Sequence, residues 1–498
     1  GMVIKVINMV LVGSNPMPCY VQAAYLMNQY RSDCQELPVP NEQVFIHTVA
    51  TQNFMSRICE MLQNKYGSNG TLLSTINLES EAEGKAEQEN IRGKITNWLN
   101  DKMEKESIDR VIVILNNTGG TKVMTTYATI ALREWCRENP AQLIECYLDD
   151  ATKKLNCVRS ISGGNEAANS KYDVYPKEKN LGYFVHLSVA EIGYLHGYKE
   201  CVNKNGALFV RPMGEAPADD GKQADFEDAL KLIAKKILND DEFRDLYLKL
   251  FARLSYLPNF KDRAGKICTS DFQYDTSNVK KPQILQLFDQ EQDGRWFHYA
   301  NGFTACSPSY GGCWINLFQK MGPLSKKQRN QDKISECMSM YTNDWFEHYV
   351  YMAVRDAVEE EQERCGGDMP EVELVWSLEV KRDSKDKGFE LDIVMSVGFE
   401  LKVISLTIDD NSLMAKHKFF EAVFRGEILG GTHSQVIAVN WAENREALKK
   451  ELSSFSGEQY HHVEIWGKDE VKDYDKLKNL VRELLRSECP NDCGEDSL

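Results

Sequence analysis

The sequence contains no apolar run long enough to span a bilayer, so we expect no helical membrane anchor. Its apolar start, residues 2–12, lacks the basic residues and the small-residue cleavage site of a signal peptide, and we expect a first strand there instead. The 14 cysteines are scattered, and Cys59, Cys136 and Cys146 lie inside apparent core segments. Reduced thiols fit that distribution better than a disulfide framework, so the sequence predicts a cytoplasmic protein with no membrane partner.

The sequence also lacks an excess of basic residues. Its 59 Lys and Arg are outnumbered by 75 Asp and Glu, which gives a formal net charge of -16. This charge disfavours a broad surface that wraps nucleic acid, but it is compatible with a local basic groove. There is no internal repeat and no long low-complexity segment. At 498 residues the chain is too long for one ordinary core, and we expect two or three domains.

Short apolar runs and helical patterns alternate through the first third of the chain. The expected strands lie at Val3–Leu11, Val44–Ile46, Leu72–Leu78, Val111–Leu115 and Leu143–Leu148, and the expected helices at Val21–Tyr30, Asn53–Tyr66 and Glu83–Lys105. Strands separated by crossover helices predict a mostly parallel, doubly wound, Rossmann-like α/β sheet, in which ligands bind beyond the carboxyl ends of the strands. The polar stretch Gly163–Lys179 is predicted to be a loop.

The segment that most suggests a ligand site has the sequence NNTGGTKVM at residues 116–124, directly after an expected strand. Its two glycines permit positive φ and close backbone approach, its threonine hydroxyls can donate hydrogen bonds, and its lysine supplies a cation. Backbone N–H groups at a helix start add to this, which is the chemistry of a phosphate-bearing ligand. The glycine spacing matches neither a Walker A loop nor the dinucleotide fingerprint, and a plain strand-to-helix turn is the alternative.

The last third of the chain has a different order of elements. Helices are expected at Asn343–Gln362, Ser412–Ile428 and Asp469–Leu485, and strands at Val372–Leu378, Phe389–Met395, Leu401–Leu406 and Gln435–Asn440. The order helix, three-strand meander, helix, strand is similar to the core of the PD-(D/E)xK nucleases. The middle region holds helical patterns and a Gly- and aromatic-rich piece from Trp296 to Trp314, which a helical, winged-helix-like domain with a β-hairpin would fit. The predicted domains are residues 1–185, 186–335 and 336–498.

The turn at residues 116–124 resembles the signature of CRISPR-associated Rossmann-fold (CARF) sensor domains, and LVGSNP at residues 11–16 resembles their other ligand loop. Residues 343–347 (NDWFE) and 425–433 (RGEILGGTH) are similar to segments of the branch that joins a CARF domain to a PD-(D/E)xK nuclease domain. The resemblance implies a sensor of cyclic oligoadenylate, a second messenger of type III CRISPR antiviral defence, whose homodimer surrounds the ring. Carried onto this chain, the ligand contacts would be Ser14, Asn15, Thr48, Asn117, Thr118, Gly119, Gly120, Thr121 and Lys122.

The nuclease resemblance implies one or two Mg²⁺ or Mn²⁺ ions held by carboxylates, and a lysine near the attacking water. Glu347 on the first helix and Asp392 on a strand fit the metal-binding carboxylates, and Glu390 precedes the second of them. Asp392 is flanked by Leu391 and Ile393 in an expected strand, where burying an acidic side chain is costly unless it has a function.

The Glu-x-Lys element that should follow is spelled by Glu400 and Lys402, close behind Asp392. In a hairpin that turns at residues 397–398, residue 395 opposes Glu400. Glu400 and Lys402 then point to the face opposite Asp392. A β-bulge would turn them inward and complete the site.

A turn shifted by one residue instead places Ser405 opposite Asp392, and the family spacing puts Ser405 and Thr407 where Glu and Lys should stand. Neither hydroxyl supplies a carboxylate or an ammonium, so the site would be degenerate. A lysine of the following helix, Lys416 or Lys418, could partly restore the cation. For such a site we expect impaired or altered cleavage.

The sequence thus predicts a cytoplasmic, dimeric sensor of cyclic oligoadenylate that controls a C-terminal, metal-dependent nuclease acting on DNA or RNA. One alternative is a non-catalytic effector whose degenerate nuclease domain binds nucleic acid or a partner. Another is a ring nuclease, in which Lys122 and the threonine hydroxyls of the CARF domain support cleavage of the messenger itself.

Overall fold

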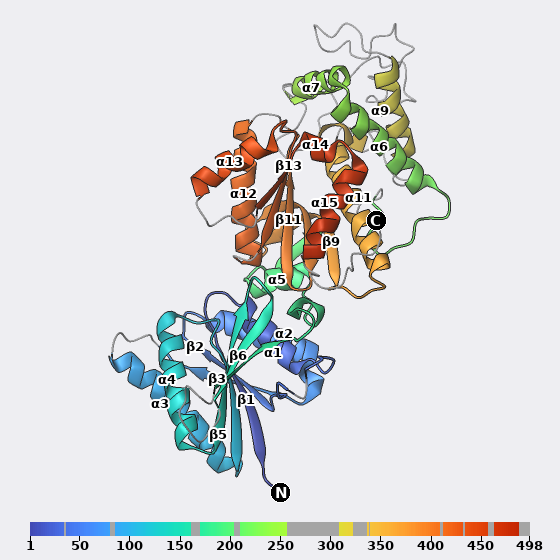
Figure 1. Ribbon diagram of the computed structural model, residues 1–498. Helices are drawn as coiled ribbons and strands as arrows, with labels where there is room; N and C mark the ends of the chain where they lie inside the picture. The colour runs from blue at the N-terminus through green and yellow to red at the C-terminus, as the bar shows by residue number, and fades with distance from the viewer. Residues whose placement is uncertain are drawn as a thin grey trace.

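The computed structural model describes residues 1–33, 36–79, 85–160, 170–203, 210–255, 308–321, 336–337, 339–408, 412–431, 434–456 and 463–487. Two lobes, each built around one sheet, follow one another in Figure 1. We call residues 1–183 the N-terminal lobe, and the second sheet with the helices of residues 339–487 the C-terminal lobe. Helix α5 (Val189–Leu195) lies between them. Within the described residues, no helix is both long and apolar enough to cross a membrane.

The sheet of the N-terminal lobe has the strand order β3-β2-β1-β4-β5-β6-β7. Neighbours from β3 to β5 pair in parallel, whereas β6 and β7 are antiparallel. The strands are β1 (Ile4–Leu11), β2 (Glu42–His47), β3 (Leu72–Asn77), β4 (Arg110–Asn116), β5 (Ala141–Asp149), β6 (Lys154–Ser160) and β7 (Ser170–Tyr175). This lobe has the predicted Rossmann-like sheet. The loop prediction for Gly163–Lys179 is wrong where β7 lies, and residues 161–169 are outside the described residues.

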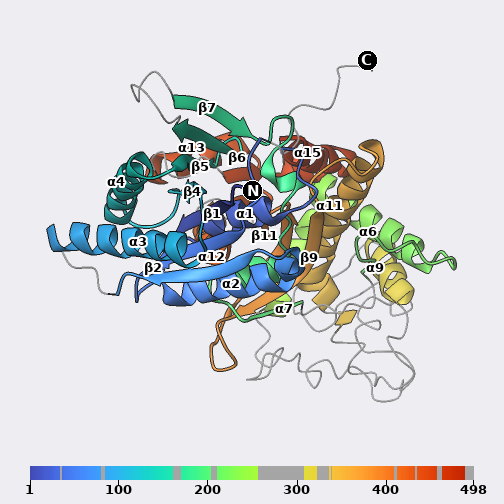
Figure 2. The same ribbon diagram turned by 90° about the horizontal axis from the view of Figure 1, so that it is seen from below.

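Helices cover both faces of this sheet. Helices α1 (Met17–Met27) and α2 (Gln52–Tyr66) pack on one face, and α3 (Lys85–Lys105) and α4 (Lys122–Glu138) on the other, where Figure 2 shows them side by side. Burial on both faces explains the continuous apolar runs of the inner strands. The strand order reverses between β1 and β4, so the loops that follow these two strands meet at the switch point where such sheets bind ligands.

The C-terminal lobe is built on a sheet of order β13-β12-β11-β10-β9-β8. Its strands are β8 (Glu200–Asn203), β9 (Val372–Lys381), β10 (Phe389–Val397), β11 (Glu400–Leu406), β12 (Gln435–Val439) and β13 (Val463–Trp466). One face packs against α11 (Trp345–Arg364) and α15 (Tyr474–Ser487), and the other against α12 (Ser412–Gly430) and α13 (Arg445–Ser456). Helix, three-strand meander, helix and strand follow one another in the order that the sequence predicted.

The middle region is divided between the two lobes and a helical group. Strand β8 joins the edge of the second sheet beside β9. Helices α6 (Lys222–Asn239), α7 (Asp241–Ser255) and α9 (Pro308–Met321) share a core with α11. The predicted β-hairpin near Trp296 lies outside the described residues, so the winged-helix-like reading stays a prediction.

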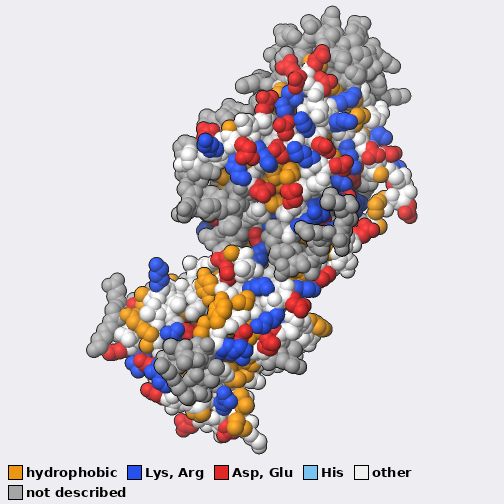
Figure 3. Space-filling model, viewed as in Figure 1, with side chains coloured by type: hydrophobic (Ala, Val, Ile, Leu, Met, Phe, Trp, Pro, Cys, Tyr) orange, Lys and Arg blue, Asp and Glu red, His pale blue; other side chains and the backbone are white. Residues whose placement is uncertain are grey.

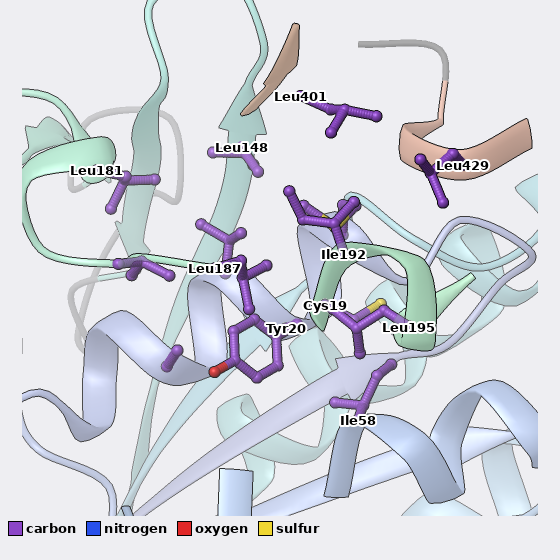
Figure 4. Packing of buried hydrophobic residues seen from close by; sticks show 14 of the residues in the cluster. Cys19, Tyr20, Ile58, Leu148, Leu181, Leu187, Ile192, Leu195, Leu401 and Leu429 are labelled. Carbon is purple, nitrogen blue, oxygen red and sulfur yellow. The ribbon is translucent and has the colours of Figure 1, made fainter. Parts of the chain in front are cut away.

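One hydrophobic core continues across the boundary between the lobes. It includes Leu148 of β5, Ile192 of α5, Leu401 of β11 and Leu429 of α12, which Figure 4 shows close together. The backbone N–H of Leu187 also donates to the backbone oxygen of residue 398 in the β10–β11 turn, at 2.9 Å. Both lobes therefore contribute side chains to one densely packed core.

Candidate functional site

The turn after β4 packs closely against the loop after β1. Gly120 has a φ of +79°, which glycine adopts without strain. A Cβ on Gly13 would lie 2.7 Å from the backbone nitrogen of Gly120, and a Cβ on Gly119 would lie 2.5 Å from the backbone oxygen of Leu11. Side chains here would push the loops apart, so the glycines bring the two candidate ligand loops together at the switch point.

Hydrogen bonds hold the polar side chains of this turn. The side chain of Asn116 accepts from the backbone N–H of Thr118 at 3.1 Å. The hydroxyl of Thr118 accepts from the backbone N–H of Leu148 in β5 at 2.8 Å. The hydroxyl of Thr121 caps α4 by accepting from the backbone N–H of Met124 at 3.2 Å. Both hydroxyls act as acceptors in these bonds, so their own hydrogens can still be donated to a ligand.

The outer side of the turn is open to solvent. Ser14, Thr121 and Lys122 are exposed, and Asn117 is half-buried. Lys122 is the first residue of α4, and its ammonium has no ion-pair partner in the described part of the chain. The positive end of a helix and an unpaired ammonium therefore lie together at an accessible position that suits an anion.

Two other predicted ligand contacts are less accessible. Asn15 is half-buried and accepts from the backbone N–H of Met17 at 3.2 Å. Thr48 is only 2% exposed, and its hydroxyl lies 3.3 Å from that of Thr51. Thr48 could touch a ligand only if its loop moved, so its role as a contact stays a prediction.

The second candidate site lies where β10 begins and β11 ends. Asp392 of β10 accepts from the backbone N–H of Leu406 at 2.8 Å. Asp392, Ser405 of β11 and Lys418 of α12 line one small hollow in the surface. Glu390 lines the same hollow and is exposed, unlike Asp392. The structure therefore brings three of the sequence-predicted residues and one predicted substitute lysine together.

Glu347 belongs to α11, on the other face of the sheet, and it lies close enough to Asp392 and Lys418 for their charges to affect it. Its carboxylate accepts from the indole N–H of Trp376 at 3.1 Å. Burial raises the pKa of Glu347 to about 8, and the charges of Asp392 and Asp344 add to this rise while Lys418 opposes it. Burial likewise raises the pKa of Asp392, and raises that of Asp344 to about 6. A bound cation would stabilise the ionised form of carboxyl groups crowded in this way.

The strand beside Asp392 is distorted. Trp376 pairs with Ile393 and Leu378 pairs with Leu391, so Ser377 stands opposite Asp392. Ser377 has a φ of +59°, which residues other than glycine rarely adopt. Strained backbone of this kind persists where surrounding contacts enforce it, and it clusters at functional sites.

Glu400 and Lys402, predicted to form the Glu-x-Lys element, lie elsewhere. The observed register pairs Val397 with Glu400 and Met395 with Lys402, so the predicted pairing of residue 395 with Glu400 is wrong. The pairing continues without the bulge that would have turned these side chains inward. Glu400 and Lys402 therefore point away from the face that carries Asp392, and they are buried near the boundary between the lobes.

The shifted register is the one observed, and it sets Ser405 opposite Asp392. Thr407 lies just beyond the end of β11 and is half-buried. Of the two lysines proposed as substitutes, Lys418 lines the hollow, whereas Lys416 forms an ion pair with a glutamate of α13. The ammonium beside Asp392 therefore comes from helix α12 and not from strand β11.

The carboxylates fit a small divalent cation. The described residues contain no group of three or more His, Cys, Asp and Glu side chains arranged to hold a metal. Mg²⁺ needs only one or two carboxylates because it keeps several water ligands. Glu347 and Asp392 are the residues that would hold it, since burial raises the pKa of both and a bound cation would stabilise their ionised forms.

Sequence reasoning did not single out Asp344, Trp376 or Gly13. Asp344 stands three residues before Glu347 at the start of a helix, a spacing that places both on one side of it. The roles of Gly13 and Trp376 depend on contacts between elements far apart in the sequence, which no local pattern reveals.

The surface around the C-terminal lobe carries both signs of charge. Figure 3 shows acidic and basic side chains interspersed over its visible face. The described residues on this face therefore show no broad basic field.

Comparison with solved structures shows a shared fold. The chain is similar to protein VC1899 from Vibrio cholerae, with a TM-score of 0.53 and 11% identity over 97% of this chain and 98% of that one. Csm6 from Enterococcus italicus bound to cyclic hexa-2'-fluoro-hexa-dAMP gives a TM-score of 0.22 and 13% identity, with 99% and 96% covered. A UDP-glucose dehydrogenase from Pyrobaculum islandicum gives 0.17 and 10%, with 95% and 88% covered. The last two TM-scores are too low to establish a shared fold with those two proteins. No protein-family model and no curated protein matches the sequence.

Proposed function

We propose that this protein senses a cyclic oligoadenylate with its N-terminal lobe and, in response, cleaves phosphodiester bonds of DNA or RNA at a metal-dependent site in its C-terminal lobe. The observation that carries the proposal is the arrangement of two half-buried carboxylates: Asp392 lines a hollow with Lys418, and Glu347 lies close enough for the charge of Asp392 to raise its pKa. These carboxylates come from a helix and a strand, and a bound cation would offset the cost of holding their charges close together.

The switch-point turn supports the sensor half of the proposal. A cyclic oligoadenylate presents repeated phosphates, and the unpaired ammonium of Lys122 at the start of α4 suits one of them. Because the ring repeats, a twofold dimer could offer each half the same turn. We therefore include a homodimer in the proposal. The free thiols of the described cysteines suit the reducing cytoplasm in which we place the protein.

At the candidate nuclease site, hydrogen bonds within the protein fix the positions of two carboxylates. The backbone N–H of Leu406 fixes one oxygen of Asp392, and the indole of Trp376 fixes one oxygen of Glu347. A bound Mg²⁺ or Mn²⁺ would neutralise phosphate charge and lower the pKa of its water. Lys418 stands where an ammonium can stabilise the negative charge that builds on the phosphate.

A non-catalytic effector is the second candidate, and one observation favours it. Ser405 stands opposite Asp392 in the position where the family spacing requires a glutamate, so the metal site has one carboxylate fewer. In that case the C-terminal lobe would bind nucleic acid or a partner without cutting it.

The experiment combines binding and cleavage with the full-length protein. Calorimetry with a panel of cyclic oligoadenylates should give saturable heat that Lys122→Ala reduces at least tenfold in affinity. Cleavage of labelled single- and double-stranded substrates with Mn²⁺ should require the ring and disappear in Asp392→Asn.

Binding without cleavage under any divalent ion would favour the non-catalytic effector, and linear oligoadenylate products that persist in Asp392→Asn would favour a ring nuclease. No heat with any ring would overturn the proposal.

A further inference from the structure

Three charged side chains form a buried cluster at the boundary between the lobes. Lys153 of the N-terminal lobe forms an ion pair with Glu400, and the ammonium of Lys402 lies 3.5 Å from the other carboxylate oxygen. Their side chains are 15%, 14% and 0% exposed, and the Lys402 ammonium also donates to the side-chain oxygen of Gln435 at 2.7 Å. We call Lys153, Glu400 and Lys402 the charge bridge. Burying charges is costly, so a cluster of this kind persists only when each member is paired.

Glu400 is ionised within the charge bridge. Its burial acts to raise its pKa, but Lys402 and Lys153 outweigh this effect and hold the pKa below its usual value. Two lysines therefore share one carboxylate. If Lys153 moves away, Lys402 still satisfies Glu400, and the contact between the lobes can break without leaving a buried charge alone.

On one side, the charge bridge connects to the candidate ligand turn. Lys153 lies between β5 and β6, and its backbone N–H donates to the oxygen of Asp149 at 2.8 Å. One residue before Asp149, the backbone N–H of Leu148 donates to the hydroxyl of Thr118 in the ligand turn. A ligand that draws on Thr118 therefore acts directly on the end of the strand that carries Lys153.

On the other side, the charge bridge connects to the candidate nuclease site. Glu400 and Lys402 belong to β11, a strand of seven residues. Leu406, at the far end of the same strand, holds Asp392 through its backbone N–H. A shift of β11 along its axis would change that hydrogen bond and with it the position of Asp392.

The boundary also contains space in which such a shift can occur. A cavity of about 210 Å³ lies beside the charge bridge. Met17, Pro18 and Leu148 line it from the N-terminal lobe, and Phe399 and Leu401 line it from the C-terminal lobe. Figure 4 shows Leu148 and Leu401 approaching from their two lobes. Dense packing would otherwise resist movement of the hairpin.

We propose that the charge bridge transmits occupancy of the ligand turn to the nuclease site, with Lys153 as the positioning residue that makes or breaks the contact between the lobes. This inference rests on the proposed function, because it concerns the regulation of that same site. It assigns Glu400 and Lys402 a role in coupling and not in the chemistry of cleavage. Coupling of this kind needs an element with two arrangements that both sites bias, and the contact of Lys153 with Glu400 supplies it.

The test compares Lys153→Met, which removes the ammonium but keeps the unbranched stem of the side chain, with Lys153→Arg and with Lys154→Met. Lys154 is the matched control, because it neighbours Lys153 but donates to a backbone oxygen within its own lobe. The readouts are ring affinity by calorimetry, Mn²⁺-dependent cleavage without the ring, and the factor by which the ring stimulates cleavage. Lys153→Met should lower that stimulation factor at least tenfold while the other two readouts stay within threefold of wild type.

The other results distinguish a failure of the coupling proposal from a failure of the proposed function on which it rests. Lys153→Arg and Lys154→Met should both keep stimulation within threefold of wild type, which would exclude a merely structural effect. Full stimulation in Lys153→Met would overturn the charge bridge as the coupling device while leaving the proposed function intact. A parallel loss of ring affinity in Lys153→Met would also overturn it, because Lys153 would then act on binding. A wild type that the ring does not stimulate would overturn the proposed function and the coupling together.

Discussion

Lys402 and Lys418 lie where the fold puts them, and the Glu-x-Lys motif did not predict either place. Lys402 stands in the sequence pattern Glu-x-Lys, yet it is buried against Glu400 on the face away from Asp392. Lys418 belongs to no motif, yet it lines the hollow beside Asp392. Both hairpin registers that the sequence allowed put Lys402 on the face away from Asp392, and the bulge that could have turned it inward is not present in the observed pairing.

The two lysines should therefore differ in their effect on cleavage. Lys418→Ala should reduce the ring-stimulated cleavage rate at least about tenfold, or about 1.4 kcal/mol, because it removes the cation beside the reacting phosphate. In Lys402→Met the unstimulated rate should stay within about threefold of wild type, since Lys153 still pairs with Glu400. Single-turnover kinetics measures both. A larger loss of unstimulated rate in Lys402→Met than in Lys418→Ala would contradict the assignment of Lys418.

Glu347 should make the stability of the metal-free protein depend on pH. Its pKa is about 8 in the folded protein, above the ordinary value of 4.5. The folded state therefore binds the proton more tightly, and stability falls as the pH rises from about 4.5 to 8. In EDTA, Glu347→Gln should be more stable than wild type at pH 8 by at least about 1 kcal/mol, and the gain should shrink toward pH 5.

Denaturant unfolding at several pH values checks this expectation. Glu363→Gln is the matched control, because Glu363 is an exposed residue of the same helix. A gain that does not vary with pH, or an equal gain in the control, would show that Glu347 is not held at a raised pKa.

At the scale of elements, the contact between the two ligand loops depends on glycine. Gly13→Ala would place a Cβ 2.7 Å from the backbone of Gly120, and we expect a loss of about 1–3 kcal/mol in stability together with weaker ring binding. Gly93→Ala in α3 is a control of opposite sign, since a Cβ there meets nothing within 4 Å and a helical alanine should stabilise by up to about 1 kcal/mol. Thermal unfolding and calorimetry measure both. If Gly13→Ala is destabilised but binds the ring with normal affinity, the contact between the two loops is not needed for ligand binding.

Long periodic elements could be predicted from the sequence, and short or edge elements could not. The strands β1 to β5 and the helices α2 and α3 lie where apolar runs and helical periodicity predicted them, because a buried face leaves a periodic pattern in the sequence. Helix α1 begins four residues before the predicted helix Val21–Tyr30 and ends three residues before its end. Strands β8 and β13 have four residues each, too few to show a period. Helix α13 was also missed, although one of its faces packs on the core.

The residues of the candidate sites also differ in whether a local sequence signal could reveal them. Asp392 could be predicted, because a carboxylate between apolar strand residues is a local signal. The contribution of Lys418 depends on how α12 packs over the sheet, and the contribution of Lys153 depends on how two lobes meet. The sequence offered Lys416 and Lys418 as equal candidates, and only the three-dimensional arrangement distinguishes them; the contact of Lys153 has no local signal at all.

At the scale of the whole molecule, the shared core should make the lobes unfold together. Leu401 is 1% exposed and belongs to the cluster that also contains α1 and α5. Leu401→Ala should cost about 2–5 kcal/mol and should reduce hydrogen-exchange protection in α1 of the N-terminal lobe as well as in β11. Exchange measured by mass spectrometry resolves the two lobes. Loss of protection confined to the C-terminal lobe would show that the boundary does not couple them.

Ring-dependent cleavage by the purified full-length protein tests the central claim most directly. With Mn²⁺ and a labelled oligonucleotide, addition of the matching cyclic oligoadenylate should raise the cleavage rate at least about tenfold in the wild type, and Asp392→Asn should lose this activity while its ring affinity is unchanged. A cleavage rate that is the same with and without every ring tested, or full activity in Asp392→Asn, would contradict the claim.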